Sequence, residues 1–243
     1  KDEVLKLGDK NDPVYGAASK TEVGRSVGEI FAYQTDGIFQ NQAEIDAAPT
    51  QIGAAPGDIR FADINGDGQI NSDDRTYQGV TMPKYTYALS FDSSYKNWDF
   101  SFAWIGSGGN KAFNGLYRTL MLGQYVNNST DILNYWSPTN TNTDIPRPVI
   151  GDPNANSRDS NRYVEDASYL RLQNVQIGYN IPIKENNTIK SVQLYVTGQN
   201  LWTITSYRGY DPDFINDGLR SRGYDAGAYP NPTSLILGLK AAF

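Results

Sequence analysis

Five segments of alternating apolar and polar residues constrain the fold of this chain more than any other feature. They lie at residues 84–95, 98–105, 167–182, 190–203 and 233–243. Alternation with a period of two is typical of β-strands that bury one face only. Most of these segments are about ten residues long or more, the length that a tilted strand needs to cross a lipid bilayer. The sequence therefore predicts long β-strands with one apolar and one polar face.

The connections between these segments alternate strictly in length. Residues 96–97 and 183–189 are short connections, whereas 106–166 and 206–232 are long ones. Barrels of the outer membrane have short periplasmic turns and long extracellular loops. The pattern therefore favours the all-β class, as a transmembrane antiparallel β-barrel segment with long extracellular loops at residues 106–166 and 206–232.

The alternation also predicts which side chains lie on each face. Residues Leu170 and Leu172 are out of phase with the lower half of their segment, so we expect a β-bulge near residues 173–174 or a projection of that half beyond the membrane. For the cleanest positions, we expect Leu89, Phe91, Leu237 and Leu239 to contact lipid, and Gln193, Thr197, Gln199 and Lys240 to face the lumen.

Composition excludes several classes of function. The chain has no His and no Cys, which removes the usual zinc sites, the Ser-His-Asp and Cys-His nucleophile systems, haem ligation and thiol chemistry. We therefore predict no enzymatic activity. The net charge of −6 argues against a nucleic-acid partner, which requires a basic surface.

One acidic loop carries a metal-binding pattern. Residues 63–74 match a calcium loop, with side-chain oxygens at positions 1, 3, 5, 9 and 12, a glycine at position 6, and a backbone carbonyl offered at position 7. Asp at position 12 replaces the usual Glu, as in dockerin-type loops. Calcium is the predicted ion and magnesium the alternative, and a plain Asx-turn loop is the competing interpretation. The predicted ligands are Asp63, Asn65, Asp67, Gln69, Asn71 and Asp74.

The remaining residues hold weaker signals. Residues 1–83 are predicted to be an extracellular loop region with one strand within 26–34, a short helix within 41–48 and the calcium-type loop, and residues 84–243 to hold the barrel strands and further loops. A second short helix is expected at 131–136. Four tyrosines in a Gly-, Asp- and Arg-rich loop are candidates for contact with a substrate or partner, with loop packing as the alternative: Tyr207, Tyr210, Tyr224 and Tyr229.

Taken together, several motifs resemble the C-terminal part of SusC/RagA-type TonB-linked outer-membrane proteins. Their order and spacing make the resemblance specific from about residue 23 onwards. The motifs are Val27–Phe31, Tyr33–Asn41, Pro56–Phe61, Asp63–Gly79, Pro83–Tyr87, Trp136–Asn140, Pro146–Pro148, Ser168–Leu172, Gln199–Leu201, Gly209–Pro212, Tyr229–Pro232 and Phe243.

This resemblance implies a twenty-two-stranded barrel with a plugged lumen in the bacterial outer membrane. It also implies import of glycans or oligopeptides, a SusD-like surface lipoprotein as partner, and TonB as the source of energy. The plug is absent from this chain, and a bacterial barrel needs at least eight strands to close. We therefore expect the five segments to complete a barrel with the remainder of the same protein. The alternative is a secreted, calcium-stabilised β-sandwich that binds carbohydrate.

Overall fold

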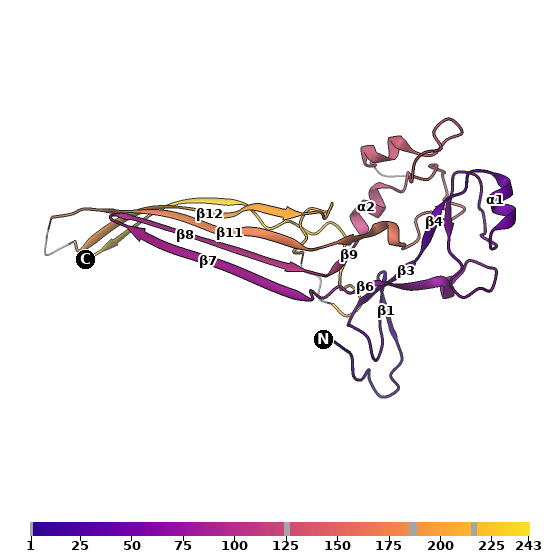
Figure 1. Ribbon diagram of the computed structural model, residues 1–243, viewed down its shortest axis with the longest axis horizontal. Helices are drawn as coiled ribbons and strands as arrows, with labels where there is room; N and C mark the ends of the chain where they lie inside the picture. The colour runs from indigo at the N-terminus through magenta and orange to yellow at the C-terminus, as the bar shows by residue number, and fades with distance from the viewer. Residues whose placement is uncertain (1, 124–126, 185–188, 215–217) are drawn as a thin grey trace.

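A long antiparallel sheet dominates the computed structural model, which describes residues 2–123, 127–184, 189–214 and 218–243 (Figure 1). Its five strands have the order β14-β12-β11-β8-β7. The turn between β7 and β8 lies at one end of the sheet together with the C-terminus, and the other elements gather at the opposite end (Figure 1). The strands are β7 (Tyr85–Tyr95), β8 (Trp98–Gly108), β11 (Tyr169–Ile181), β12 (Ser191–Thr205) and β14 (Ser234–Ala242).

The other elements are short and form a layer of small sheets and single helical turns. Three of these sheets have the strand orders β1-β2-β3-β6, β10-β9-β13 and β4-β5. The strands are β1 (Val14–Gly16), β2 (Ser19–Thr21), β3 (Glu29–Tyr33), β4 (Thr35–Ile38), β5 (Ile59–Phe61), β6 (Arg75–Gly79), β9 (Lys111–Asn114), β10 (Val164–Asp166) and β13 (Tyr224–Asp225). The helices are α1 (Gln42–Ala47) and α2 (Gly115–Leu120), with 3₁₀ turns η1 (Ser72–Asp74), η2 (Thr130–Asn134) and η3 (Asn161–Tyr163).

All five predicted strands are confirmed, with boundaries that differ by at most three residues. The predicted strand within 26–34 and the helix within 41–48 are present as β3 and α1. The prediction for 131–136 corresponds to the 3₁₀ turn η2. The prediction of a single strand in residues 1–83 is wrong, because the described part of this region, residues 2–83, holds six. Strands of three to five residues are too short for a period of two to be visible in the sequence.

Register across the sheet separates an apolar face from a polar one. One row runs Leu237, Val196, Ile177 and Phe100 through consecutive paired strands. The next row on the other face includes Thr197, which lies opposite Gln176. The apolar face, defined by Leu89, Phe91, Phe100, Phe102, Ile177, Leu194, Val196, Leu237 and Leu239, is exposed along much of its length. The eight positions assigned from the sequence fall on the two faces as predicted.

A β-bulge keeps the apolar face continuous over the whole of β11. The register of β11 shifts between Leu172 and Asn174 against both of its neighbours. On the C-terminal side of the shift, the odd-numbered residues of β11 lie on the apolar face. On its N-terminal side, Leu172 lies on that face, between Trp104 and Trp202. This is the bulge that the sequence predicts. The extra residue of the bulge reverses the alternation of apolar and polar residues. The apolar side chains of both halves of β11 therefore lie on the same face of the sheet.

Hydrogen bonds between side chains join the strands on the polar face. The carboxylate of Asp99 accepts from Ser94 Oγ at 2.6 Å, from Asn180 Nδ2 at 2.6 Å and from Gln193 Nε2 at 2.7 Å. These residues belong to four consecutive strands, β7, β8, β11 and β12. A carboxylate that accepts three hydrogen bonds ties the sheet together near its turn end.

The sheet has two open edges within the part of the chain that the structure describes, because β7 and β14 each pair on one side only. Unpaired backbone groups are not tolerated in the hydrocarbon region of a bilayer, so a spanning sheet must close into a barrel. Closure therefore requires strands other than these five. Neither described helix has the length and hydrophobicity needed to span a membrane.

The two faces lead to opposite expectations for neighbouring residues on β7. Leu89 is 63% exposed on the apolar face, and Ser90 lies on the polar face opposite Ala103. In the full-length protein, Leu89→Arg should reduce barrel assembly, since a lipid-facing arginine near the bilayer midplane costs about 2–4 kcal/mol. Ser90→Arg is the matched control and should assemble normally. Heat-modifiable migration on gels measures the folded fraction, and equal assembly of both variants would show that the faces are misassigned.

Candidate functional site

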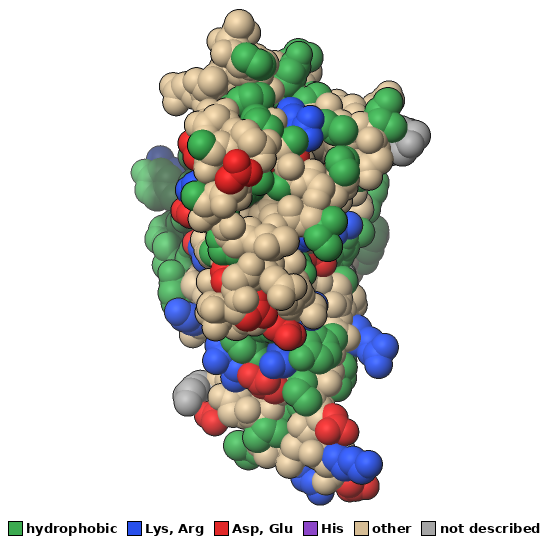
Figure 2. Space-filling view, turned by 90° about the vertical axis from the view of Figure 1, so that its right-hand side faces the viewer, with side chains coloured by type: hydrophobic (Ala, Val, Ile, Leu, Met, Phe, Trp, Pro, Cys, Tyr) green, Lys and Arg blue, Asp and Glu red, His purple; other side chains and the backbone are tan. Residues whose placement is uncertain are grey.

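The candidate site is the layer that covers one end of the sheet. It combines residues 2–83 with the described residues of the two long connections, and its largest hydrophobic cluster contains Ile30, Ala32, Phe113 and Tyr163. Seen from that end, the surface is mostly uncharged and polar, with small groups of hydrophobic and charged side chains (Figure 2). Such a surface can present hydrogen-bonding groups at the end of the sheet.

A buried ion pair fixes the connection between β12 and β14 to the polar face of the sheet. Arg171 of β11 is 3% exposed and lies on the same face as Thr203, to whose Oγ1 its Nε donates at 3.0 Å. The same guanidinium pairs with Asp211 and, at 3.4 Å, with Asp213. Asp211 also accepts from the backbone of Asn231 at 3.0 Å. This long connection therefore folds over the polar face.

Asp211 is ionised in this setting. Burial opposes ionisation, but hydrogen bonds from the backbone of Asp213 and Asn231, together with the Arg171 guanidinium, outweigh it and lower the pKa of Asp211. The pKa in the folded state lies below that of the unfolded chain. The stabilisation is therefore present at neutral pH and is lost as the pH falls through the folded-state pKa.

Glu165 provides a second polar anchor for the same connection. Its Oε1 accepts from Arg208 Nε at 3.0 Å and from Asn114 Nδ2 at 3.0 Å, and its Oε2 accepts from the Arg208 backbone at 2.8 Å. Glu165 is buried in β10, and Asn114 is the last residue of β9. The two long connections are thus joined to each other through one buried carboxylate.

The four candidate tyrosines separate into two pairs. The hydroxyl of Tyr207 is buried and donates to Asp225 Oδ2 at 2.6 Å, and the ring of Tyr224 stacks on Phe113 with centroids 5.4 Å apart. These two side chains pack within the layer. Tyr210 and Tyr229 are 66% and 89% exposed. The contact prediction stays open for these two, which are accessible to another molecule.

The calcium-type loop closes through its own backbone. Asp63 accepts from the backbone of Gly66 at 2.7 Å and of Gly68 at 2.8 Å, and both glycines have positive φ. Asp67 accepts from the backbone of Gln69 at 2.8 Å, which is the main reason that its pKa is lowered. These are Asx-turn contacts. They bring the predicted ligands at positions 1, 3 and 5 into one tight turn.

Position 12 of the loop is buried. Asp74 is fully inaccessible, and its two oxygens accept from the backbone of Ile64 at 2.9 Å and of Asn71 at 2.7 Å. The side-chain oxygen of Asn71 accepts from the backbone of Asp73 at 2.8 Å. Among the residues that the structure describes, no three carboxylate, imidazole or thiolate side chains lie close enough together to hold a metal ion.

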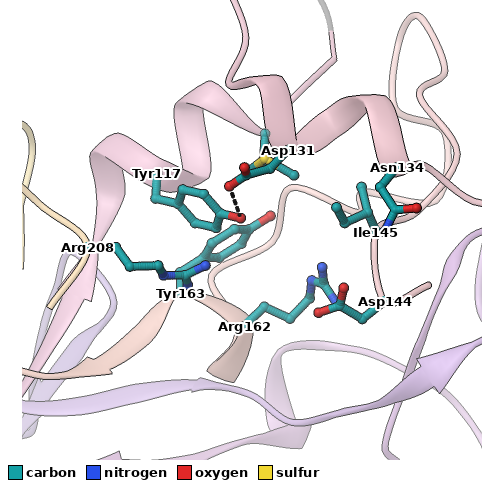
Figure 3. Close-up of a pocket in the computed structure, with 9 residues that line it drawn as sticks. Tyr117, Asp131, Asn134, Asp144, Ile145, Arg162, Tyr163 and Arg208 are labelled. Carbon is teal, nitrogen blue, oxygen red and sulfur yellow. Dashed lines mark hydrogen bonds between the residues drawn. The ribbon is translucent and has the colours of Figure 1, made fainter. Parts of the chain in front are cut away.

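A polar cavity of about 360 Å³ lies between α2, η2 and η3 (Figure 3). The hydroxyl of Tyr117 donates to Asp131 Oδ2 at 3.1 Å, and Arg208 lies 3.9 Å from the centre of the Tyr117 ring. Arg162 and Asp144 line the opposite side (Figure 3). The sequence gives no sign of this cavity, because its lining residues are up to about ninety positions apart and no spacing rule connects them.

Known proteins share this architecture. The TonB-dependent receptor P3 of Formosa agariphila is 37% identical over 262 residues, in an alignment that covers 100% of this chain and 26% of the receptor. Receptor P26 of the same organism is 34% identical over 91% of this chain. SusC of Bacteroides thetaiotaomicron, also a TonB-dependent receptor, is 28% identical over 99% of this chain and 23% of SusC. The chain belongs with the SusC/RagA-like TonB-dependent receptors.

Solved structures agree with this assignment. A structure described as the RagAB peptide transporter superposes with a TM-score of 0.74 and 23% identity, covering 99% of this chain and 26% of the other. The SusC/RagA-like chain thus has the fold of an outer-membrane barrel segment, and its location is the bacterial outer membrane. It spans about a quarter of the length of the curated relatives that it matches. No protein-family model matches it.

The β-sandwich alternative is wrong for this SusC/RagA-like chain. A sandwich requires a second sheet packed on the apolar face. Within the described ranges, the five long strands form one sheet, and its apolar face remains exposed. The relatives are TonB-dependent receptors, which are transporters rather than enzymes, in agreement with the predicted lack of catalysis.

The buried ion pair makes a prediction about the connection between β12 and β14. In the full-length receptor, Asp211→Asn should loosen this connection, because it removes the buried partner of Arg171 and leaves the guanidinium with only the longer contact to the half-exposed Asp213. Asp213→Asn is the matched control, since Asp213 is 45% exposed and contacts the guanidinium at 3.4 Å. Hydrogen exchange of the segment 206–214 measures the loosening. Equal exchange in both variants would contradict the role given to the pair.

Proposed function

We propose that this chain forms part of the wall and outer rim of a TonB-dependent importer of glycans or oligopeptides. The observation that carries the proposal is the sheet with one apolar and one polar face, capped at one end by a layer of polar loops. The apolar face contacts lipid, and the polar face lines the route of the substrate. Residues 1–83 and the two long connections form the extracellular layer above it.

The partners follow from the family. A SusD-like lipoprotein docks on the extracellular layer, and the plug and TonB act through parts of the receptor outside this chain. The description of the matched structure as the RagAB peptide transporter supports an assembly of two components. Tyr210 and Tyr229, the two exposed tyrosines of the connection between β12 and β14, are proposed contacts with substrate or lipoprotein.

Growth and co-purification test this function. Cells without the gene for the full-length receptor should fail to grow on an oligosaccharide or oligopeptide mixture that supports the parent strain. The intact gene should restore growth, and a gene without the TonB-contacting segment, expressed to the same level, should not. A tagged receptor solubilised in detergent should co-purify a surface lipoprotein. Unchanged growth on every such mixture, with no lipoprotein recovered, would contradict the proposal.

We also propose that residues 63–74 bind Ca²⁺, with Mg²⁺ as the alternative ion. The spacing of the oxygen donors supports this, and so does the turn that gathers Asp63, Asn65 and Asp67. An ionised carboxylate has about four lone-pair sites, so a carboxylate that accepts one or two backbone hydrogen bonds can still bind a cation. The ion would order the loop and take no part in chemistry on the substrate.

A calcium titration tests this second proposal. In the full-length receptor, hydrogen exchange of the loop should slow as calcium rises, with half-saturation near about 10⁻⁴–10⁻³ M for a site of the extracellular class. Asp67→Ala should abolish the calcium response. Asp46→Ala is the control, because Asp46 lies in α1 and its contact is to Gln42. Exchange that is the same with and without calcium in the unmodified receptor would remove the proposal.

A further inference from the structure

In the described part of the long sheet, three glycines lie beneath a tyrosine ring of the neighbouring strand. Glycine weakens a strand interior and often marks a place where another group approaches the backbone closely. A Cβ atom added at any of the three would lie within 3.0 Å of the ring opposite. The pairs are Tyr85 with Gly108 and Tyr87 with Gly106, between β7 and β8, and Tyr195 with Gly238, between β12 and β14.

Each of these rings fills the space that a side chain on the neighbouring strand would need. Tyr87 shows how far such a ring reaches. Its hydroxyl donates to the carbonyl oxygen of Tyr169 at 3.0 Å, so the side chain crosses β8 at Gly106 and reaches β11. We call each pair of a tyrosine and the glycine beneath its ring a tyrosine–glycine seat.

The seats lie on the two strand pairs that include the edges of the described sheet. Strands β7 and β14 each have one hydrogen-bonded neighbour there. The alternation of apolar and polar residues excludes a shift of such a strand by one residue, because every side chain would turn to the other face. A shift by two residues keeps both faces. Alternation alone therefore does not determine the register of these pairs.

The two seats between β7 and β8 distinguish the observed register from the shifted ones. Two tyrosines two residues apart lie opposite two glycines with the same spacing. A shift by two residues in either direction leaves one tyrosine without its glycine. In one direction Tyr85 would lie opposite Asn110, and in the other Tyr87 would lie opposite Trp104. A ring would then meet a side chain where the observed register offers bare backbone.

The seat between β12 and β14 acts in the same way. A shift by two residues would place Ile236 or Lys240 opposite Tyr195. In the observed register Lys240 Nζ lies 5.2 Å from the centre of the Tyr195 ring, within the distance at which a ring face attracts a cation. The observed pairing thus gives the ring a glycine beneath it and a cation beside it.

We propose that the tyrosine–glycine seats set the register of β7 on β8 and of β14 on β12 when the sheet is assembled. Several pairings place the apolar side chains toward lipid, and the seats select one of them. This role belongs to the folding of the sheet and is independent of the molecule that the receptor transports.

Disulfide formation in the full-length receptor, with any other cysteine replaced, measures the register of β7 on β8. Ser90→Cys with Ala103→Cys joins positions that lie opposite each other. Ser90→Cys with Ser101→Cys, or with Ile105→Cys, joins positions displaced by two residues. A disulfide needs Cβ atoms about 3.5–4.5 Å apart, whereas diagonal neighbours in a sheet are about 7–8 Å apart. With both seats intact, only the first of these three disulfides should form.

Removing both seats should change this result. Tyr85→Ala with Tyr87→Ala should shift part of the disulfide yield to the displaced positions, because shifts by two residues are then allowed. Phe91→Ala with Tyr95→Ala is the matched control, since it removes two aromatic rings from the same strand and face that lie opposite residues other than glycine. The control should form the first disulfide alone. The same distribution of disulfides in both variants would overturn the proposal.

A rescue experiment decides the matter if the variant without seats does not assemble. Gly108→Ala should lower the assembled fraction, measured by heat-modifiable migration, because its Cβ would collide with the ring of Tyr85. Adding Tyr85→Ala should restore assembly, since the colliding ring is removed. Normal assembly of Gly108→Ala, or no recovery in the double variant, would show that the ring and the glycine do not act as a pair and would overturn the proposal.

Discussion

Every backbone amide within a bilayer needs a partner, and the rest of this structure depends on that constraint. The five long strands meet it by pairing along most of their length, with one interruption at the register shift between Leu172 and Asn174. Edge strands β7 and β14 meet it on one side only. The sheet is therefore stable in lipid as part of a closed barrel, and the receptor family to which the chain belongs supplies that setting.

The bulge in β11 follows from the same constraint. Moving a whole strand by one residue in lipid would break its backbone hydrogen bonds to both neighbours. The change in alternation between Leu172 and Asn174 is instead accommodated by one extra residue at that point. Asn200 of β12 takes a positive φ at the corresponding height. As a result, the apolar face continues along the strands as far as Leu170 and Ile204. It is therefore longer in the strand direction than it would be without the bulge.

At the loop-bearing end of the sheet, buried polar contacts act together with small apolar clusters. Arg171 and Glu165 each hold a loop in place through charge-assisted hydrogen bonds in a setting sheltered from water. A loop held by one or two such pairs keeps a defined position without a large core. This arrangement leaves room for a polar cavity between the helical turns.

The sequence by itself determined the long strands, their faces, the bulge and the family, because a period of two over ten residues and a dozen ordered motifs are local signals. It also indicated the turn at residues 63–74, where Asp and Gly act on neighbouring backbone groups. Only the tertiary structure decided that Tyr207 and Tyr224 pack inside while Tyr210 and Tyr229 stay exposed. Only the fold brings Arg162 and Asp131 to the same cavity and pairs Arg171 with Asp211, since the residues of each pair are about thirty to forty positions apart. Such pairings depend on how loops cross the end of the sheet, and no periodicity along the chain records that path.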